Sequence, residues 1–265
     1  MSTADLLRAY DEQLRSDAET PSAVAVTRMG PLRLVEFAAG RGFVTYRDLG
    51  GADAAGIARL VAQARAFFES APSVTEVEWK TRGHDDAPGL AAALRAHGFV
   101  AEETESIMIG EVERLIQNVD LPAGVSLRRV TEEEDVRAMC AMQDRVFGDE
   151  VSEVYANAVV ARLARADGME LWIAEHDGRI VSAGRLEPVA GTEFAGIWGG
   201  ATLEEWRGRG IYRALTAARA RSALVMGKTL IHSDSTEFSR PILERSGLVR
   251  VSTTTPYVWR RAIGA

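Results

Sequence analysis

Residues 194–215 of this 265-residue chain read FAGIWGGATLEEWRGRGIYRAL and change character twice along their length. The apolar start predicts a strand over Phe194–Leu203, and the alanine- and leucine-rich end begins a helix predicted over Gly210–Met226. A short turn rich in glycine and arginine joins them. Because N–H groups at a helix start point outward and carry partial positive charge, such a turn is typical of a phosphate-binding site.

The turn provides both close backbone approach and charge. Gly208 and Gly210 leave room for a ligand against the main chain, while three guanidinium groups suit phosphate oxygens, those of Arg207, Arg209 and Arg213. The turn lacks the Gly-Lys-Ser/Thr of a Walker loop and the third glycine of a dinucleotide fingerprint. The alternative is a surface loop whose arginines serve solubility, but strand, turn and helix all fall in register for phosphate binding.

Glycines also interrupt the predicted strand, at Gly196, Gly199 and Gly200. Glycine inside a strand often marks a bulge or a place where a ligand lies against the backbone. A strand edge freed in this way can bond an extended, amide-bearing chain such as pantetheine. The alternative is tight packing against Trp198 or Trp206.

The order of predicted elements repeats along the chain. Each half is expected to hold strands, then a helix, then a further strand: 32–37, 43–47, 54–69 and 74–80 in the first, and 171–175, 179–186, 194–203, 210–226 and 229–233 in the second. Leu94–Val100 also resembles Leu243–Val249, which favours an ancient duplication. Thr131, with Glu134 three residues later, predicts a capping box at the start of a helix.

These patterns predict an α/β chain, with an α+β mixed sheet, in two tandem domains. We expect a first domain over residues 1–116, a linker over 117–124 and a second domain over 125–265. The linker is inferred from asparagine, aspartate, proline and glycine without clear periodicity.

Composition excludes several classes of function. Hydrophobic residues make up 46% of the chain and charged residues 26%, as in ordinary globular proteins. The net charge of −7 argues against a nucleic-acid partner and weakly favours a cationic small one. No apolar run approaches a membrane span. The one cysteine, Cys140, leaves no disulfide framework and no cysteine-based zinc site, so we expect a cytoplasmic protein without a metal.

With these residues in place, the sequence resembles the GNAT superfamily of CoA-dependent N-acetyltransferases. The signature of the superfamily is Gln/Arg-x-x-Gly-x-Gly/Ala at a helix start, and this chain has Arg207-x-x-Gly210-x-Tyr212. The resemblance implies two tandem GNAT-like domains, each a central mixed sheet flanked by helices, the first of them degenerate. It also implies acetyl-CoA as co-substrate, a splayed sheet, and CoA-binding residues that comprise Gly200, Ala201, Thr202, Arg207, Gly208, Arg209, Gly210, Ile211, Tyr212, Arg213 and Ser239.

The sequence departs from the family pattern in three places. Tyr212 stands where the family usually has Gly or Ala. Leu243 stands where many members have the tyrosine that protonates the departing thiolate, and we expect neither Tyr212 nor Tyr257 to replace it. The turn over 47–53 in the first half carries two acids that would repel pyrophosphate, so one CoA per chain is expected.

Acyl transfer to an amine requires a base, a donor to the oxyanion and a route for the thiolate to leave. Glu193 and Asp234 are the candidate bases by position, and backbone N–H groups over 199–201 are the candidate donors. Further candidates are Glu150, Glu153 and His232. For every one of them, a solvated acid or a packed histidine is the competing interpretation.

The function inferred from sequence is transfer of an acetyl group from acetyl-CoA to an amine, by direct attack on the thioester. The acceptor is a small-molecule amine or a peptide, with neither nucleic acid nor membrane as a partner. One alternative is a non-catalytic acyl-CoA-binding or regulatory protein, suggested by Leu243. Another keeps the enzyme but makes the acceptor a protein N-terminus or lysine.

Overall fold

A computed structural model describes residues 1–262 and divides the chain into two compact units. The N-terminal unit comprises Ser2–Ile107 and the chain from Arg250 onward, and the central unit comprises Met108–Val249 together with Met1. These limits differ from the division at residues 117–124 expected from sequence. The reason is the last strand, whose residues 254–260 pair with the first half of the chain.

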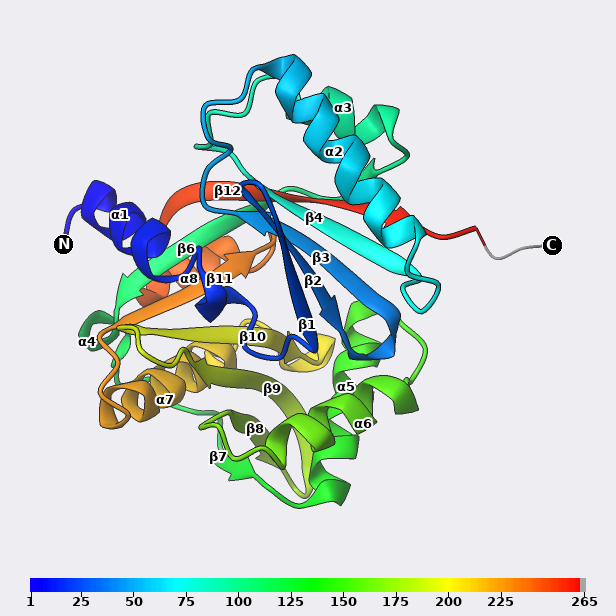
Figure 1. The fold of residues 1–265 in the computed structure, drawn as a ribbon. Helices are drawn as coiled ribbons and strands as arrows, with labels where there is room; N and C mark the ends of the chain where they lie inside the picture. Colours follow the sequence, from blue (N-terminus) through cyan, green and yellow to red (C-terminus); the bar gives the residue numbers. More distant parts are fainter. Residues whose placement is uncertain (263–265) are drawn as a thin grey trace. The chain divides into compact units, whose positions relative to one another are not determined.

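The N-terminal unit holds a sheet in the order β1-β2-β3-β4-β12. Its elements are α1 (Thr3–Gln13), β1 (Ala25–Met29), β2 (Leu32–Phe37), β3 (Arg41–Tyr46), α2 (Ala54–Glu69), β4 (Glu76–Arg82), α3 (Leu90–Ala96) and β5 (Val100–Ala101). Strands β2 and β3 pair antiparallel, and β3 and β4 pair parallel across α2. Helices α2 and α3 lie together over the sheet (Figure 1), where Phe68 and Trp79 are fully buried.

The central unit has a similar order of strands and helices, with longer strands. Its elements are α4 (Val112–Leu115), β7 (Val125–Val130), α5 (Glu133–Phe147), α6 (Glu153–Leu163), β8 (Glu170–His176), β9 (Arg179–Pro188), β10 (Phe194–Thr202), α7 (Ile211–Val225), β11 (Leu230–Ser235) and α8 (Arg240–Ser246). Strands β7 to β10 form an antiparallel meander, and β10 then pairs parallel with β11. Strands β6 (Glu105–Glu111) and β12 (Val249–Arg260) each run from one unit into the other. The expected mixed sheet with flanking helices is confirmed.

Helices cover both faces of the central sheet (Figure 1). Helix α7 packs on one face through Ala220 and Ala223, which contact Ala195 and Ile197 of β10. Helices α5 and α6 pack on the other face, in a core that contains Ile173. Because successive residues of a strand point to opposite faces, this arrangement decides which side chains of β10 face which helices.

The hairpin between β8 and β9 has a tight turn, since Asp177 and Gly178 have φ of 48° and 73°, as an Asp-Gly pair favours. The expected capping box at Thr131 is wrong, because α5 is capped at Glu132 and has no side-chain cap hydrogen bond. Asp135 occupies the third helical position instead, and Arg128 holds it with two hydrogen bonds of 2.6 and 3.0 Å.

Candidate functional site

Strand β10 contains a bulge at its glycines. Trp198 lies opposite Arg185 and Ala201 lies opposite Ala183, so β10 uses three steps where β9 uses two. Gly199 has φ of +60°, a conformation that favours glycine. The Gln143 amide of α5 donates to the Gly199 carbonyl at 2.5 Å and fixes the bulge from one side. The bulge predicted from sequence is therefore present.

The parallel strands β10 and β11 separate just before this bulge. Their pairing covers only Phe194–Gly196 against Leu230–His232, although both strands continue further. The hydroxyl of Ser233 donates to the Ile197 carbonyl at 2.9 Å and closes the pairing. Beyond this point the main chain of β10 runs without β11 as its ladder partner.

The basic turn leads from β10 into an uncapped helix. Gly210 is the N-cap of α7, and no side chain caps the helix there. Its φ of 81° and the φ of 74° at Gly208 both require glycine, because a side chain would be strained in this region. The first N–H groups of α7 therefore have neither helical partners nor a capping side chain.

The three arginines around the turn direct their hydrogen bonds and ring contact to neutral groups. The Nε of Arg207 donates to the Thr202 carbonyl at 3.1 Å, and Arg213 donates to the side-chain oxygen of Gln117 at 3.0 Å. The Arg209 guanidinium lies over the Trp206 ring, 4.9 Å from its centroid. A backbone hydrogen bond and, less strongly, Arg209 lower the pKa of the nearby Glu205 carboxyl, but none of the three arginines lies within ion-pair distance of a carboxylate in residues 1–262, so their charge is available to an anion.

The equivalent turn in the N-terminal unit is closed by its own acids. The Asp53 carboxylate caps α2 by accepting from the Gly56 N–H at 2.7 Å, and Asp48 accepts from the Gly50 N–H at 2.8 Å. These carboxylates satisfy N–H groups that an anion would otherwise use. They also place negative charge at the helix start, as the sequence indicated.

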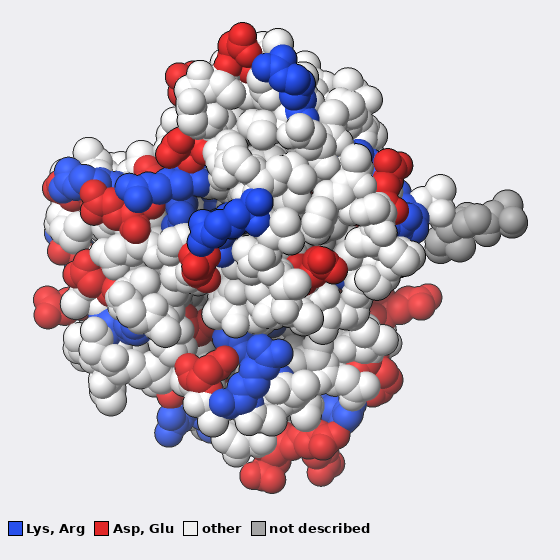
Figure 2. Space-filling view, viewed as in Figure 1, with Lys and Arg blue, Asp and Glu red and all other residues white. Residues whose placement is uncertain are grey.

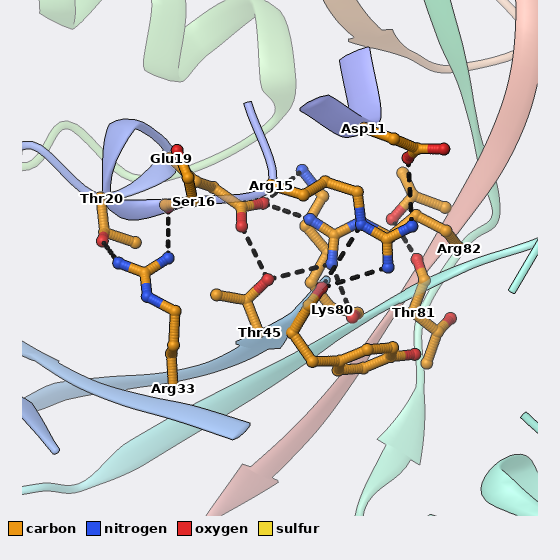
Figure 3. A network of polar contacts seen from close by, with 12 residues as sticks. Asp11, Arg15, Ser16, Glu19, Thr20, Arg33, Thr45, Lys80, Thr81 and Arg82 are labelled. Atoms are coloured by element: carbon orange, nitrogen blue, oxygen red, sulfur yellow. Dashed lines mark hydrogen bonds and ion pairs between the residues drawn. The ribbon is translucent and has the colours of Figure 1, made fainter. Parts of the chain in front are cut away.

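Side chains also occupy the place where β3 and β4 separate in this unit (Figure 3). The parallel pairing ends at Val44 and Trp79, and Arg15 then donates to the Tyr46 carbonyl through Nε and Nη2, at 3.3 and 3.1 Å. Arg82 donates to Thr45 Oγ1 at 3.0 Å and to Glu19. Burial acts to lower the pKa of Arg82, but Glu19 and its other neighbours outweigh burial and raise that pKa.

The two candidate bases lie at different ends of the parallel pair. Glu193 precedes β10, six residues from Gly199 or about 20 Å along a strand, and it accepts from Thr229 Oγ1 at 3.2 Å. Asp234 follows the end of the pairing and shares a strand face with His232. The His232 ring makes an edge contact with Trp198, with centroids 5.1 Å apart. The structure thus brings His232 and Trp198 into contact, with Asp234 on the same face of β11 as His232, and places Glu193 at the other end of the pair.

The remaining candidates have ordinary surroundings. Glu153 forms an ion pair with Arg137 at 2.8 Å, and Glu150 is exposed in the loop before α6. Ser239 is the N-cap of α8 and bonds to the hydroxyl of Ser235 at 2.8 Å. Cys140 is in the core, where burial raises the pKa of its thiol to about 11.

Two side chains acquire a role that the sequence did not suggest. The ring of Tyr212 lies against the bulge and not toward the arginines, since a Cβ at Gly200 would be 2.3 Å from its Cε2 and 2.7 Å from its hydroxyl. Arg219 of the same helix is fully buried. An arginine in a helix normally indicates a surface position. The only feature of the sequence that could have indicated the burial of Arg219 is its place among alanines, seven residues after Tyr212.

The fold and this site can be compared with known proteins. Residues 112–232 match the model of an acetyltransferase (GNAT) domain. No curated protein sequence matches the chain significantly. The predicted resemblance to the GNAT superfamily, in a tandem arrangement, is confirmed by this match together with the solved structures of similar fold.

Solved structures with similar folds cover nearly the whole chain. A GCN5-related N-acetyltransferase from Kribbella flavida has a TM-score of 0.69 and 20% identity, over 97% of this chain and 95% of that one. A tandem GNAT protein from the clavulanic acid biosynthesis pathway, solved without acetyl-CoA, has a TM-score of 0.62 and 15% identity, over 100% and 98%. A functionally unknown conserved protein from Staphylococcus epidermidis has a TM-score of 0.66 and 13% identity, over 90% and 94%.

Residues 1–262 contain neither a membrane-spanning helix nor a cluster of metal-ligating side chains. No described helix is long and apolar enough to cross a membrane. The same residues contain no group of three or more histidine, cysteine, aspartate or glutamate side chains able to hold a metal ion. On the face shown in Figure 2, basic and acidic side chains are interspersed among neutral ones.

Proposed function

We propose that the central unit is an acetyl-CoA-dependent N-acetyltransferase. The observation that carries this proposal is the uncapped start of α7, which lies beside a bulged strand and has three nearby arginines that form no ion pair in the described chain. A helix start with free N–H groups and nearby guanidinium groups suits a pyrophosphate. The match of residues 112–232 to a GNAT domain model supports CoA as the molecule that contains this pyrophosphate.

The donor would extend from the turn along β10. The pyrophosphate would contact the main chain over 207–213 and the side chains of Arg207, Arg209 and Arg213. The pantetheine amides would bond Gly200, Ala201 and Thr202. Since β11 has already left β10 at this level, these backbone groups have no ladder partner from that side. Ser239 would face the donor from the start of α8.

Chemistry at the thioester requires a base and an oxyanion donor. Asp234 is the proposed base because it is half-buried, lies beyond the end of the parallel pair and shares a face with His232 and Trp198. Backbone N–H groups at the bulge, over 199–201, are the proposed donors to the developing oxyanion. The acceptor is an amine on a small molecule or a peptide.

Exchanging one arginine for an acid tests the donor site. Arg207→Glu replaces attraction with repulsion, and the loss of one charge-assisted contact is about 1.5–3 kcal/mol, or at least about tenfold in Kd. Titration calorimetry with CoA measures this directly. Arg8→Glu is the matched control, because Arg8 is an exposed arginine of α1. Equal CoA affinity in the Arg207→Glu variant and the wild type would remove the pyrophosphate assignment.

A second function is favoured by Leu243. This residue is buried in a hydrophobic core, so the usual acid of the family is absent from α8. A protein that binds acyl-CoA without turning it over would account for that. Binding of one CoA, with no acetyl transfer to any member of a panel of amines and peptides, would support the binding protein over the enzyme.

A further inference from the structure

Arg219 is a buried cation without an anionic partner. Its exposure is 0%, and its hydrogen bonds go to the carbonyls of Leu215 and Arg185, at 3.2 Å each, and to Thr216 Oγ1 at 3.3 Å. It forms no ion pair with any carboxylate in the described chain. Leaving a buried charge uncompensated is costly, and such groups cluster at functional sites.

The nearest group that can respond to this charge is Tyr212. The Arg219 guanidinium lies 5.8 Å from the centroid of the Tyr212 ring, two helical turns away on the same face of α7. Desolvation lowers the pKa of Arg219, and hydrogen bonding and Coulombic interaction with Tyr212 oppose that shift. The phenol of Tyr212 and the guanidinium of Arg219 therefore interact with each other directly.

Two glycines make room for this pair of side chains. A Cβ at Gly184 of β9 would be 2.5 Å from Arg219 Nη1, and a Cβ at Gly200 would be 2.7 Å from the Tyr212 hydroxyl. Neither contact could be accommodated without moving the charged or the phenolic group. The hydroxyl is thus held at the backbone of the bulge, the segment to which the proposed function assigns the end of pantetheine.

The phenol and the proposed base approach this segment from opposite faces of the sheet. Tyr212 comes from α7, whose alanines pack on Ala195 and Ile197. Trp198, by alternation, faces the other way, and the rings of Trp198 and His232 are in contact. Asp234 follows on the same side as His232. Asp234 can therefore act on the attacking amine and Tyr212 on the departing thiolate, from different sides of one carbonyl carbon.

We propose that Tyr212 is the catalytic acid that protonates the departing thiolate, and that Arg219 is its positioning residue. This assignment rests on the proposed function and replaces the sequence-based expectation that Tyr212 acts only in binding. It deepens that function by locating an acid on α7 in a chain whose α8 carries Leu243.

The protons balance as follows. The amine nitrogen bonds to the thioester carbonyl carbon and gives up one proton, which Asp234 accepts. As the C–S bond breaks, Tyr212 gives its phenolic proton to sulfur, and Arg219 stabilises the phenolate that remains. Solvent then carries the proton from Asp234 back to Tyr212. The products are one amide and one free thiol, and both side chains are restored.

The test compares two tyrosine variants in the whole protein. Tyr212→Phe should lower kcat by about 100-fold or more, within the range typical of general acids, while the Kd for CoA stays within about threefold by calorimetry. Tyr257→Phe is the matched control, because Tyr257 is a buried tyrosine of the N-terminal unit. The kcat of this variant should stay near that of the wild type. An active wild type with a Tyr212→Phe kcat within tenfold of it overturns the assignment.

Arg219 variants separate positioning from a purely structural role. Arg219→Met removes the cation that stabilises the phenolate, so kcat should fall by about tenfold or more while the Kd for CoA stays within about threefold, and Arg219→Lys should restore part of the lost kcat. If Arg219→Met does not fold, the kcat of Arg219→Lys, compared with that of Tyr212→Phe, still tests whether Arg219 acts through Tyr212. An unchanged kcat in a folded Arg219→Met variant overturns the role of Arg219. A wild type that binds CoA and never turns over defeats the proposed function itself.

Discussion

The ring of Tyr212 lies directly against the Cα of Gly200, so close that a Cβ on that glycine would be 2.3 Å from the tyrosine Cε2. Through this contact, helix α7 packs against the bulge of β10. Any side chain at position 200 must displace the ring. The contact therefore relates the stability of the central unit to the position of the phenol.

Gly200→Ala should destabilise the protein by about 1–3 kcal/mol, the usual cost of overpacking. Tyr212→Ala in the same chain removes the ring that the new methyl group meets. The double variant should consequently lose less stability than the sum of the two single variants. Denaturant unfolding of the four proteins in the cycle measures this, and strictly additive losses would contradict the contact.

One CoA should bind per chain. The α2 start in the N-terminal unit is capped by Asp53, whereas the α7 start in the central unit has no side-chain cap. Calorimetric titration should give a stoichiometry of one, and Arg207→Glu should weaken that single event. A second binding event that survives Arg207→Glu would mean that the N-terminal unit is a working site.

Glu19→Gln should destabilise the N-terminal unit strongly. Arg82 has no exposed side-chain surface, and Glu19 is its charged partner. Removing one member of a buried pair typically costs about 3–5 kcal/mol, because the other charge stays buried without compensation. Arg8→Gln, which breaks an exposed pair with Asp5, should leave the unfolding midpoint close to that of the wild type, because solvent screens such a pair. Similar unfolding midpoints for both variants would contradict the buried network.

Asp234→Asn should lower kcat by about 10²–10⁴-fold if Asp234 is the base. Glu193→Gln is the matched control, since Glu193 lies at the other end of the parallel pair beside Thr229. Its kcat should remain within about tenfold of the wild type. Steady-state kinetics at saturating acetyl-CoA distinguish the two. The reverse order of effects would move the catalytic base to the start of β10.

Cys140 should not react with thiol reagents in the native protein. Burial favours the neutral thiol and raises its pKa to about 11, so little thiolate exists at pH 8. A chromogenic disulfide reagent should label less than a tenth of the thiol in the time that labels it fully after denaturation. Rapid native labelling would mean that the core between α5 and α6 opens.

Sequence reasoning found the strand, bulge, turn and helix because each has a local cause. Gly199 and Gly200 signal the bulge, and Gly208 and Gly210 signal left-handed backbone at the turn. The unit limits were harder, because the pairing of β12 with β4 joins residues about 180 positions apart, a relation that no local pattern carries. The capping box failed because α5 begins one residue later than Thr131 suggests.

The candidate site was predictable where backbone conformation defines it and not where side chains meet. The basic turn is readable from glycine and arginine alone. The approach of Tyr212 to Gly200 depends on the angle at which α7 crosses β10, and the burial of Arg219 depends on the space left by Gly184. Neither relation has a signature in a single sequence.

Acetyl transfer by the wild-type protein tests the central claim most directly. Acetyl-CoA is incubated with a panel of polyamines, amino sugars, free amino acids and lysine-containing peptides, and thiol release and acetylated product are quantified together by mass spectrometry. The account predicts equimolar thiol and N-acetylated amine for at least one acceptor, with both lost in Arg207→Glu. Tight binding of one CoA with no acetylated product from any acceptor would contradict it.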